Sequence, residues 1–330
     1  MSELPFPALR RVVRSRHNGD TAVPLLDYLS RRFDYLSREE WVEQIQAGNL
    51  SLDQNTAAID QILLPGAMLE FSPRDLAEPP VSWDIQTIFE DERLLVIAKP
   101  ANLPCHPAGA FFNHTLWAWL KQHKGLPEMH FCNRLDRETS GLLLIGKNPA
   151  AAKQINLALQ QPDARKEYLA LVHGKFPSAK KCLGWMLPDQ QSAIRKKRAF
   201  LENLPAGVPT GETAETEFTL LAYHNKDDIS LVQAILKTGR THQIRATLSS
   251  LGFPLIGDKL YGVDESFFLK LVAEELSRED QRRLILPRQA LHAWKISFRL
   301  PGAAEPLQFT AALPQDLSAF LEKLDFSTPQ

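Results

Sequence analysis

The feature that most constrains the fold is a pair of patterned segments in residues 216–239. Apolar and polar residues alternate on both sides of the polar stretch HNKDD, residues 224–228. Alternation with a period of two is typical of strands that bury one face, and a polar turn between two such strands predicts an antiparallel hairpin. The hairpin argues against a doubly wound fold, in which the strands run parallel.

Further segments extend the same pattern. Strands are predicted within residues 85–99, 141–148 and 166–174, and helices within 113–125, 150–161 and 241–252. Strands outnumber helices, and hairpins outnumber strand–helix–strand units, which is typical of the α+β class. The predicted fold is therefore a largely antiparallel mixed sheet flanked by helices and loops.

A small α/β module is predicted near the N-terminus. Leu25, Leu26, Leu29 and Phe33 have helical spacing. A second helix is predicted to start at Ser37, because Glu40 three residues later completes a capping box. Short strand-like pieces follow, so two helices and a small sheet are expected in few residues.

Composition suggests where this module ends. Residues 72–83, SPRDLAEPPVSW, are rich in proline and acidic residues, which is typical of a linker. We predict a basic arm over residues 1–20, the small module over 21–75, a linker over 76–82, and a larger domain over 83–330.

Cysteine content points to a reducing compartment. The chain of 330 residues has three scattered cysteines and no C-x-x-C pair, which argues against a disulfide framework and against a zinc ribbon. No apolar run reaches the ~18 residues of a membrane span, and the N-terminus has no apolar signal segment. The sequence predicts a cytoplasmic protein without membrane association.

The overall charge alone would not suggest a nucleic-acid partner, because the formal net charge is −1. Two local clusters are strongly basic, namely RRVVRSR at residues 10–16 and RKKR at residues 195–198. Such clusters are compatible with a positive groove on an otherwise neutral body, or with an ordinary solvated surface.

The stretch NRLDRETSG, residues 133–141, is the strongest candidate for a site. It places Asp136 between two arginines and runs directly into the apolar segment 142–145. A solvated turn explains its polar end, but it explains less well why Leu135 lies between charged residues. Physical reasoning leaves two interpretations open: a surface turn, or a carboxylate held for chemistry.

Four further segments carry a specific resemblance. They are KEYLALVHG (166–174), LKTGRTHQIR (236–245), FPLIGDKLYG (253–262) and RQALHA (288–293). Together with the nonapeptide, in this order and approximate spacing, they resemble the RluA-type pseudouridine synthases over roughly residues 83–312. The first 75 residues resemble an S4-type RNA-binding domain.

The resemblance implies an isomerase that detaches uracil from its ribose in RNA, rotates it and rejoins it through C5. It assigns the nucleophile to Asp136 and the arginine that keeps it ionised to Arg245, with Arg240 as second choice. Tyr168 would stack on the base, where an aromatic face contributes roughly 1–3 kcal/mol. Leu255 would lie on the other side of the base.

The resemblance also implies how the RNA is held. Arg134 would fill the space that the flipped uridine leaves, and Arg137 would contact phosphate or orient the loop. Asp258 and Lys259 are expected to form a surface salt bridge or a phosphate contact. The partner would be structured ribosomal or transfer RNA, not DNA, and the enzyme is expected to be a monomer that needs no metal or organic cofactor.

The chain departs from the family pattern at two places. Asn133 stands where the family most often has histidine, so we expect an amide that hydrogen-bonds the loop. The helix expected to face RNA carries Glu39, Glu40 and Glu43, and acids oppose binding to phosphate. The small module therefore either uses Arg31, Arg32 and the basic arm for RNA, or serves as a scaffold.

Two other classes of function compete with the first. One is a non-catalytic RNA-binding protein that keeps the fold, although the predicted site is intact. The other is a glycosidase, which commonly employs two carboxylates, whereas Glu138 is the only acid beside Asp136 in the sequence. Structural roles are expected for other conspicuous residues: hydrogen bonding for His242 and His292, and burial for Trp117, Trp119, Cys105 and Cys132.

Overall fold

The computed structural model describes residues 4–9, 11–33, 35–73, 77–204, 207 and 211–329. They form two compact units, the first from residues 1–81 and 103–127, the second from 82–102 and 128–330. Two predictions fall partly outside the described residues: Arg10 of the first basic cluster, and residues 74–76, where the predicted module meets its linker.

The part of the first unit that the structure describes contains a small sheet and three short helices. In chain order its elements are β1 (Val13–Arg16), β2 (Val23–Pro24), α1 (Leu25–Arg32), α2 (Arg38–Gln46), β3 (Leu50–Leu52), β4 (Asn55–Thr56), β5 (Ile62–Leu63), β6 (Met68–Phe71) and α3 (Leu116–Gln122). Strands β1, β6, β3 and β4 form one sheet in that order, and β2 pairs with β5.

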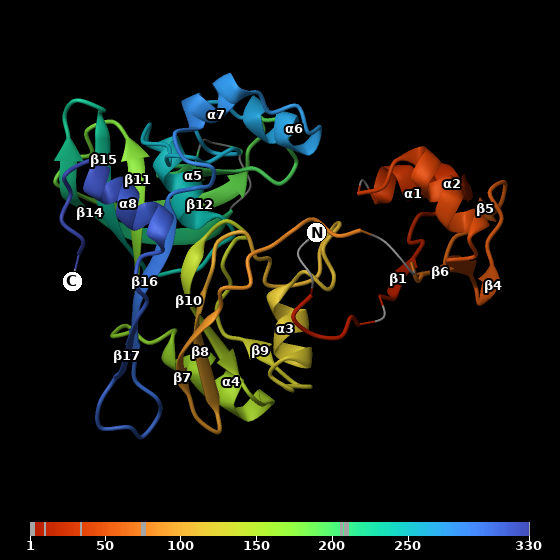
Figure 1. The fold of residues 1–330 in the computed structure, drawn as a ribbon, viewed down its shortest axis with the longest axis horizontal. Coiled ribbons are helices and arrows are strands. Elements are labelled where there is room, and N and C mark those ends of the chain that lie inside the picture. The colour runs from red at the N-terminus through yellow and green to blue at the C-terminus, as the bar shows by residue number, and fades with distance from the viewer. Residues whose placement is uncertain are drawn as a thin grey trace. The chain divides into compact units, whose positions relative to one another are not determined.

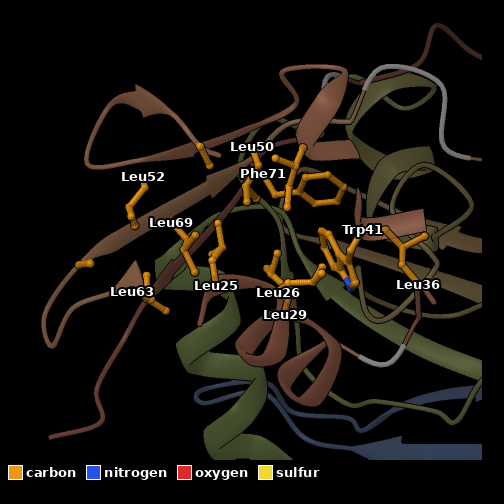
Figure 2. Packing of buried hydrophobic residues seen from close by; sticks show 13 residues of the cluster. Leu25, Leu26, Leu29, Leu36, Trp41, Leu50, Leu52, Leu63, Leu69 and Phe71 are labelled. Atoms are coloured by element: carbon orange, nitrogen blue, oxygen red, sulfur yellow. The ribbon is translucent and has the colours of Figure 1, made fainter. Parts of the chain in front are cut away.

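An aromatic and aliphatic core holds the module between β2 and β6 together, as Figure 2 shows. Trp41 of α2 is fully buried, and its ring lies 4.8 Å from that of Phe71 on β6. Leu25 and Leu29 of α1 fill the space beneath the sheet. The helical spacing seen in the sequence thus corresponds to one buried face of α1.

The predicted start of the second helix is confirmed. The Ser37 side chain accepts the Glu40 backbone N–H, and the Glu40 carboxylate accepts the N–H of Ser37. The helix stops before Gly48, whose φ of +71° few other residues adopt readily.

The second unit is built on one large sheet. Its strands are β7 (Gln86–Glu90), β8 (Leu94–Lys99), β9 (His130–Phe131), β10 (Ser140–Gly146), β11 (Arg165–His173), β12 (Ala179–Pro188), β13 (Arg198–Leu201), β14 (Glu212–His224), β15 (Ile229–Leu236), β16 (Leu291–Phe298) and β17 (Leu307–Thr310). The order is β13-β12-β14-β15-β11-β16-β10-β8-β7, with β17 beside β16 and β9 beside β10.

The sheet is almost entirely antiparallel, as the hairpin predicts, and that hairpin is β14 and β15. The exception lies at the centre, where β10 and β16 run parallel. Because β11 pairs antiparallel with β16, the starts of β10 and β16 and the middle of β11 meet at one place. The predicted α+β class with a mixed sheet is confirmed.

Among the described residues of this unit, five helices flank the sheet: α4 (Pro149–Ala158), α5 (Gln243–Ser250), α6 (Ser266–Val272), α7 (Arg278–Leu284) and α8 (Gln315–Lys323). Helix α4 packs on β8, β10 and β16, and α8 packs on β11 and β15 (Figure 1). In the described part of the chain, no helix has the length and apolar character needed to cross a bilayer.

The division into units differs from the predicted domains at one segment. Residues 103–127, which include α3, group with the N-terminal residues instead of the large sheet. The Glu78 carboxylate contributes to this grouping, because it accepts the backbone N–H groups of Phe112, Asn113 and His114 at 2.6–2.8 Å. The sequence after the linker is therefore divided between the two units.

Candidate active site

The loop that carries Asp136 is fixed at both ends. At its start, Asn133 donates to the Leu142 carbonyl and accepts the Leu144 N–H, both on β10. At its end, Gly141 has a φ of +112°, and a Cβ there would run into the Ala293 carbonyl of the parallel strand β16. Asn133 therefore hydrogen-bonds the loop as expected, and only glycine allows the close approach of the two strands.

Asp136 is paired with an arginine from far along the chain. The Arg245 Nη1 donates to Asp136 Oδ2 at 2.6 Å. Arg245 lies on α5, and its side chain is 9% exposed, against 31% for that of Asp136. Arg240, the second choice for this partner, lies elsewhere: its Nε donates to the Thr213 carbonyl and its Nη1 is 3.6 Å from Glu212.

A second carboxylate holds the same arginine from the other side. Asp258 accepts from Arg245 Nε at 2.7 Å and from Nη2 at 2.9 Å, a two-point contact that fixes the plane of the guanidinium. Asp258 is fully buried and also accepts the N–H groups of Leu260 and Tyr261. The expectation of a surface salt bridge or phosphate contact is therefore wrong for Asp258.

These contacts set the charges at the site. Burial by itself raises the pKa of Asp136, but the charge of Arg245 and its hydrogen bond to Asp136 outweigh it, so the pKa lies below its ordinary value. The same balance lowers the pKa of Asp258. Burial opposes the charge of Arg245, and the two carboxylates more than offset it, so the pKa of Arg245 is raised. All three groups are ionised at neutral pH.

His242 faces the other oxygen of Asp136. Its Nε2 lies 3.7 Å from Asp136 Oδ1, and its Nδ1 lies 2.9 Å from the Tyr261 hydroxyl. Burial lowers the pKa of His242 more than the nearby carboxylates raise it. Tyr261 also lies beneath the Arg245 guanidinium, whose carbon is 4.9 Å from the ring centre.

Gln289 is a polar neighbour that sequence reasoning missed. Its Nε2 donates to Thr139 Oγ1 at 2.5 Å and lies 3.4 Å from Asp136 Oδ2. Gln289 precedes β16 and is buried. A glutamine directly before an apolar strand was the available signal, because a buried amide needs partners.

Glu138, on the Asp136 loop, forms a second ion pair with the buried Lys259. The Lys259 ammonium donates to both Glu138 oxygens, at 3.0 and 3.1 Å, and to the Pro287 carbonyl at 2.6 Å. Its side chain is only 8% exposed. Lys259 therefore braces the Asp136 loop. The predicted surface salt bridge between Asp258 and Lys259 is wrong, because Lys259 pairs with Glu138, and the phosphate contact of Lys259 stays a prediction.

Tyr168 lies on β11, near enough to Asp136 to be affected by its charge, and Leu255 bridges the same strand. Tyr168, on β11, stands opposite Ala293 of β16 and is buried. Burial, reinforced by the charge of Asp136, raises the pKa of its hydroxyl, which stays protonated. Leu255 is fully buried and forms a bridge with Val172, four residues further along β11 than Tyr168.

The two arginines near Asp136 in the sequence, Arg134 and Arg137, have different surroundings. Arg134 is exposed. Arg137 is partly exposed, lies 3.5 Å from Glu138, and offers its backbone carbonyl to Lys99 Nζ at 3.2 Å. The backbone that follows Asp136 is thus held by Lys99, whereas the Arg134 side chain is open to solvent.

The remaining structural expectations are mostly met. Trp119 and Cys105 are buried, whereas Trp117 and Cys132 are only half-buried. His292 has the predicted structural role, because its ring bridges Ser140 Oγ at 2.9 Å and the Ala311 carbonyl at 3.3 Å.

His292 gives a prediction for stability against pH. Burial lowers its pKa to about 4, below the ~6.5 expected in the unfolded chain. Between these values the unfolded state binds more protons, so stability falls as the pH drops from 6.5 to 4, by about 3 kcal/mol at most. In His292→Gln the unfolding midpoint should be lower at pH 7 but fall less between pH 6.5 and 4. An unchanged slope would show that His292 does not titrate in this window.

Comparison with known proteins identifies the class. The family profile for RNA pseudouridylate synthase matches residues 93–250. A ribosomal large subunit pseudouridine synthase D from Nitrosomonas europaea is 32% identical over 296 residues, which is 86% of this chain and 78% of the relative. The mitochondrial tRNA pseudouridine(32) synthase of Saccharomyces cerevisiae is 31% identical over 73% of this chain and 51% of its own length.

A solved structure agrees on the fold. Human RNA pseudouridylate synthase domain containing 1 aligns over 77% of this chain and 99% of its own, with a TM-score of 0.53 and 24% sequence identity. The fold and the sequence together define an RNA-modifying isomerase. The chain belongs to the RluA-type family of RNA pseudouridine synthases, which convert uridine in RNA to pseudouridine.

Proposed function

We propose that Asp136 is the nucleophile of this isomerisation and that Arg245 keeps it ionised. One observation carries the proposal: Arg245 is held by Asp258 on one side and binds Asp136 on the other. A carboxylate that must attack from a partly enclosed pocket needs such a cation, because burial alone would protonate it. Asp258 fixes the arginine in place, so the cation is present before the substrate arrives.

The chemistry requires a leaving group that stays in the site. In one route an Asp136 oxygen bonds to the sugar C1′ as the glycosidic bond to N1 breaks and the uracil leaves as an anion. In a second route Asp136 adds to the base C6 before that bond breaks, and in a third Asp136 removes the C2′ proton and the sugar becomes a glycal. The uracil turns and C5 bonds to C1′, any bond to the Asp136 carboxylate breaks, C5 loses its proton and N1 gains one. Tyr168 would stack on the turning base and Leu255 would close its other side, which limits the entry of water.

The surrounding acids support an isomerase over a hydrolase. A glycosidase needs a second carboxyl group as acid or base beside the first. Glu138 pairs with Lys259, and Asp258 pairs with Arg245. Each of these two carboxylates is therefore already bound to a cation. Neither is available to activate a water molecule.

For the substrate, we propose structured ribosomal or transfer RNA. The relatives above are named for one or the other of these RNAs. Arg134 would enter the space that the flipped uridine leaves, and Arg137 would steady the loop or reach a phosphate. We further propose that the chain works as a monomer in the cytoplasm.

The small module of the first unit is proposed to assist RNA binding. Its acidic helix α2 does not favour phosphate, and two of its arginines are already paired, Arg14 with Glu70 and Arg38 with Asp27. Arg31 and Arg32, exposed in the last turn of α1, are the better candidates for phosphate contacts.

The test is pseudouridine mapping on unmodified RNA. Ribosomal and transfer RNA prepared without modification are each incubated with the enzyme, and new pseudouridines are located by sequence position. We expect conversion at one or a few uridines of one RNA class, and none with Asp136→Asn protein at the same concentration. Equal conversion in the two proteins, or none in either RNA class, would overturn the assignment.

A further inference from the structure

A chain of hydrogen bonds leads from the backbone of β13 to the candidate nucleophile. The Arg198 N–H donates to the Tyr261 oxygen at 2.9 Å, and the Tyr261 hydroxyl lies 2.9 Å from His242 Nδ1. The opposite ring nitrogen, Nε2, faces Asp136 Oδ1 at 3.7 Å. A backbone N–H can only donate, so the tyrosine oxygen is an acceptor at the first contact.

The order of donors fixes the protonation of the histidine ring. Burial raises the pKa of Tyr261 to about 12, so its hydroxyl keeps its proton. That proton needs an acceptor, and His242 Nδ1 is at hydrogen-bond distance. A neutral His242 that accepts at Nδ1 carries its own proton on Nε2, which is the atom that faces Asp136.

We propose that His242 is a positioning residue for Asp136, and that Tyr261 selects the tautomer with which it acts. This inference rests on the proposed role of Asp136 as nucleophile. Arg245 binds Oδ2, and the Nε2–H of His242 restrains Oδ1. The two contacts together stop the carboxylate from rotating about its last bond, and the 3.7 Å contact shortens when substrate fills the site.

The backbone supports a dedicated role. His242 has a φ of +57° and is the left-handed residue at the start of α5, a conformation that is uncommon outside glycine, although asparagine, aspartate and histidine adopt it more often than other residues do. The Gln243 side chain holds this turn by accepting from the Arg240 N–H and the Thr238 hydroxyl. It also donates to the Glu215 carbonyl. Several hydrogen bonds thus hold the turn in place at the residue that faces the nucleophile.

The charges around the ring favour the neutral form. Asp136 and Asp258 attract a proton to His242, while Arg245 and Lys196 repel it, and burial opposes the cation most strongly. His242 therefore works as a hydrogen-bond donor at neutral pH and not as a second cation beside Arg245.

Two substitutions separate positioning from a purely structural role. In His242→Gln, the amide nitrogen can take the place of Nε2 and still donate to Asp136. In His242→Asn, the shorter amide overlaps Nδ1 and cannot reach the carboxylate. We expect kcat to fall about 10²-fold in His242→Asn, the scale of a small misplacement of a reacting group, with KM for RNA nearly unchanged and most of kcat restored in His242→Gln.

A structural role predicts the reverse order, because asparagine tolerates a positive φ better than glutamine does. An Asn variant as active as the Gln variant would therefore overturn the inference. Asp136→Asn distinguishes this failure from that of the proposed function: if that variant is inactive while both His242 variants are fully active, only the role of His242 is wrong.

The tautomer can be tested on the unaltered enzyme. Nitrogen NMR of histidine-labelled protein, with the His242 signals assigned through their loss in His242→Gln, should show a proton on Nε2 and none on Nδ1. In Tyr261→Phe the two tautomers should mix and kcat should fall. Because Tyr261 acts through His242, adding Tyr261→Phe to His242→Asn should cause no further loss. A proton on Nδ1 in the wild type, or fully additive losses in the double variant, would contradict the inference.

Discussion

Replacement of Asp136 by asparagine is expected to lower the single-turnover rate of pseudouridine formation by roughly 10⁴-fold or more, as the loss of a triad residue does in a covalent hydrolase. The amide keeps the shape of the carboxylate but cannot attack carbon. Arg245 remains bound to Asp258, so the site should keep its geometry. RNA affinity should change little, because the lost group acts in the chemical step.

The control for this experiment is Asp163→Asn. Asp163 is exposed and lies 3.7 Å from Arg299, so the variant makes the same chemical change at a surface ion pair. It should retain the wild-type rate. Asp136→Ala is measured alongside, because it excludes recovery of the acid by deamidation. Turnover by Asp136→Ala at the wild-type rate would remove Asp136 from the mechanism.

Replacement of Arg245 by methionine is expected to cost both activity and stability. The change leaves Asp258 fully buried without its cation, and removal of one partner of a buried pair typically costs about 3–5 kcal/mol. The nucleophile also loses the charge that lowers its pKa. Urea denaturation and single-turnover kinetics measure the two losses separately.

The sign of the pH dependence sharpens this prediction. In the wild type, the lowered pKa values of Asp136 and Asp258 contribute stability at neutral pH, and this contribution is lost as the pH falls through the folded-state values. In Arg245→Met, burial raises the pKa of Asp258 and only the backbone N–H groups of Leu260 and Tyr261 still oppose it, so the pKa is higher than in the wild type. The stability deficit of the variant should therefore shrink as the pH falls from 7 to 5.

Two further variants test whether the buried charge of Asp258 causes the loss of stability in Arg245→Met. Arg245→Lys keeps a charge but cannot make the two-point contact with Asp258, so an intermediate loss of stability is expected. Adding Asp258→Leu to Arg245→Met removes the stranded carboxylate and should restore part of the stability. A deficit that is equal at pH 5 and 7 and unaffected by Asp258→Leu would show that the buried charge is not its source.

Local signals in the sequence were sufficient for much of the fold. The alternation around residues 224–228 gave the β14–β15 hairpin, and Ser37 with Glu40 gave the start of α2. These features depend on residues within a few positions of one another. The grouping of residues 103–127 with the first unit could not be read in this way, because it depends on contacts that pattern alone does not reveal.

The candidate site also depends on contacts between residues far apart in the sequence, which local signals do not predict. The pairing of Asp136 with Arg245 joins residues 109 positions apart, and it was anticipated through the family resemblance and not through spacing. Asp258 was expected at the surface because an isolated Asp-Lys pair in a loop usually is. Its burial follows from the backbone N–H groups and the arginine that it binds. Gln289 is 153 positions from Asp136, and nothing local indicates that the two meet.

The most direct test of the central claim is a crystal structure of Asp136→Asn bound to its substrate RNA. The side chain at position 136 should lie about 3–3.5 Å from C1′ or C6 of the target uridine, the separation of a productive near-attack arrangement. Arg245 should contact the same side chain. A target uridine held against another residue, with position 136 facing solvent and Arg245 turned away, would contradict the account.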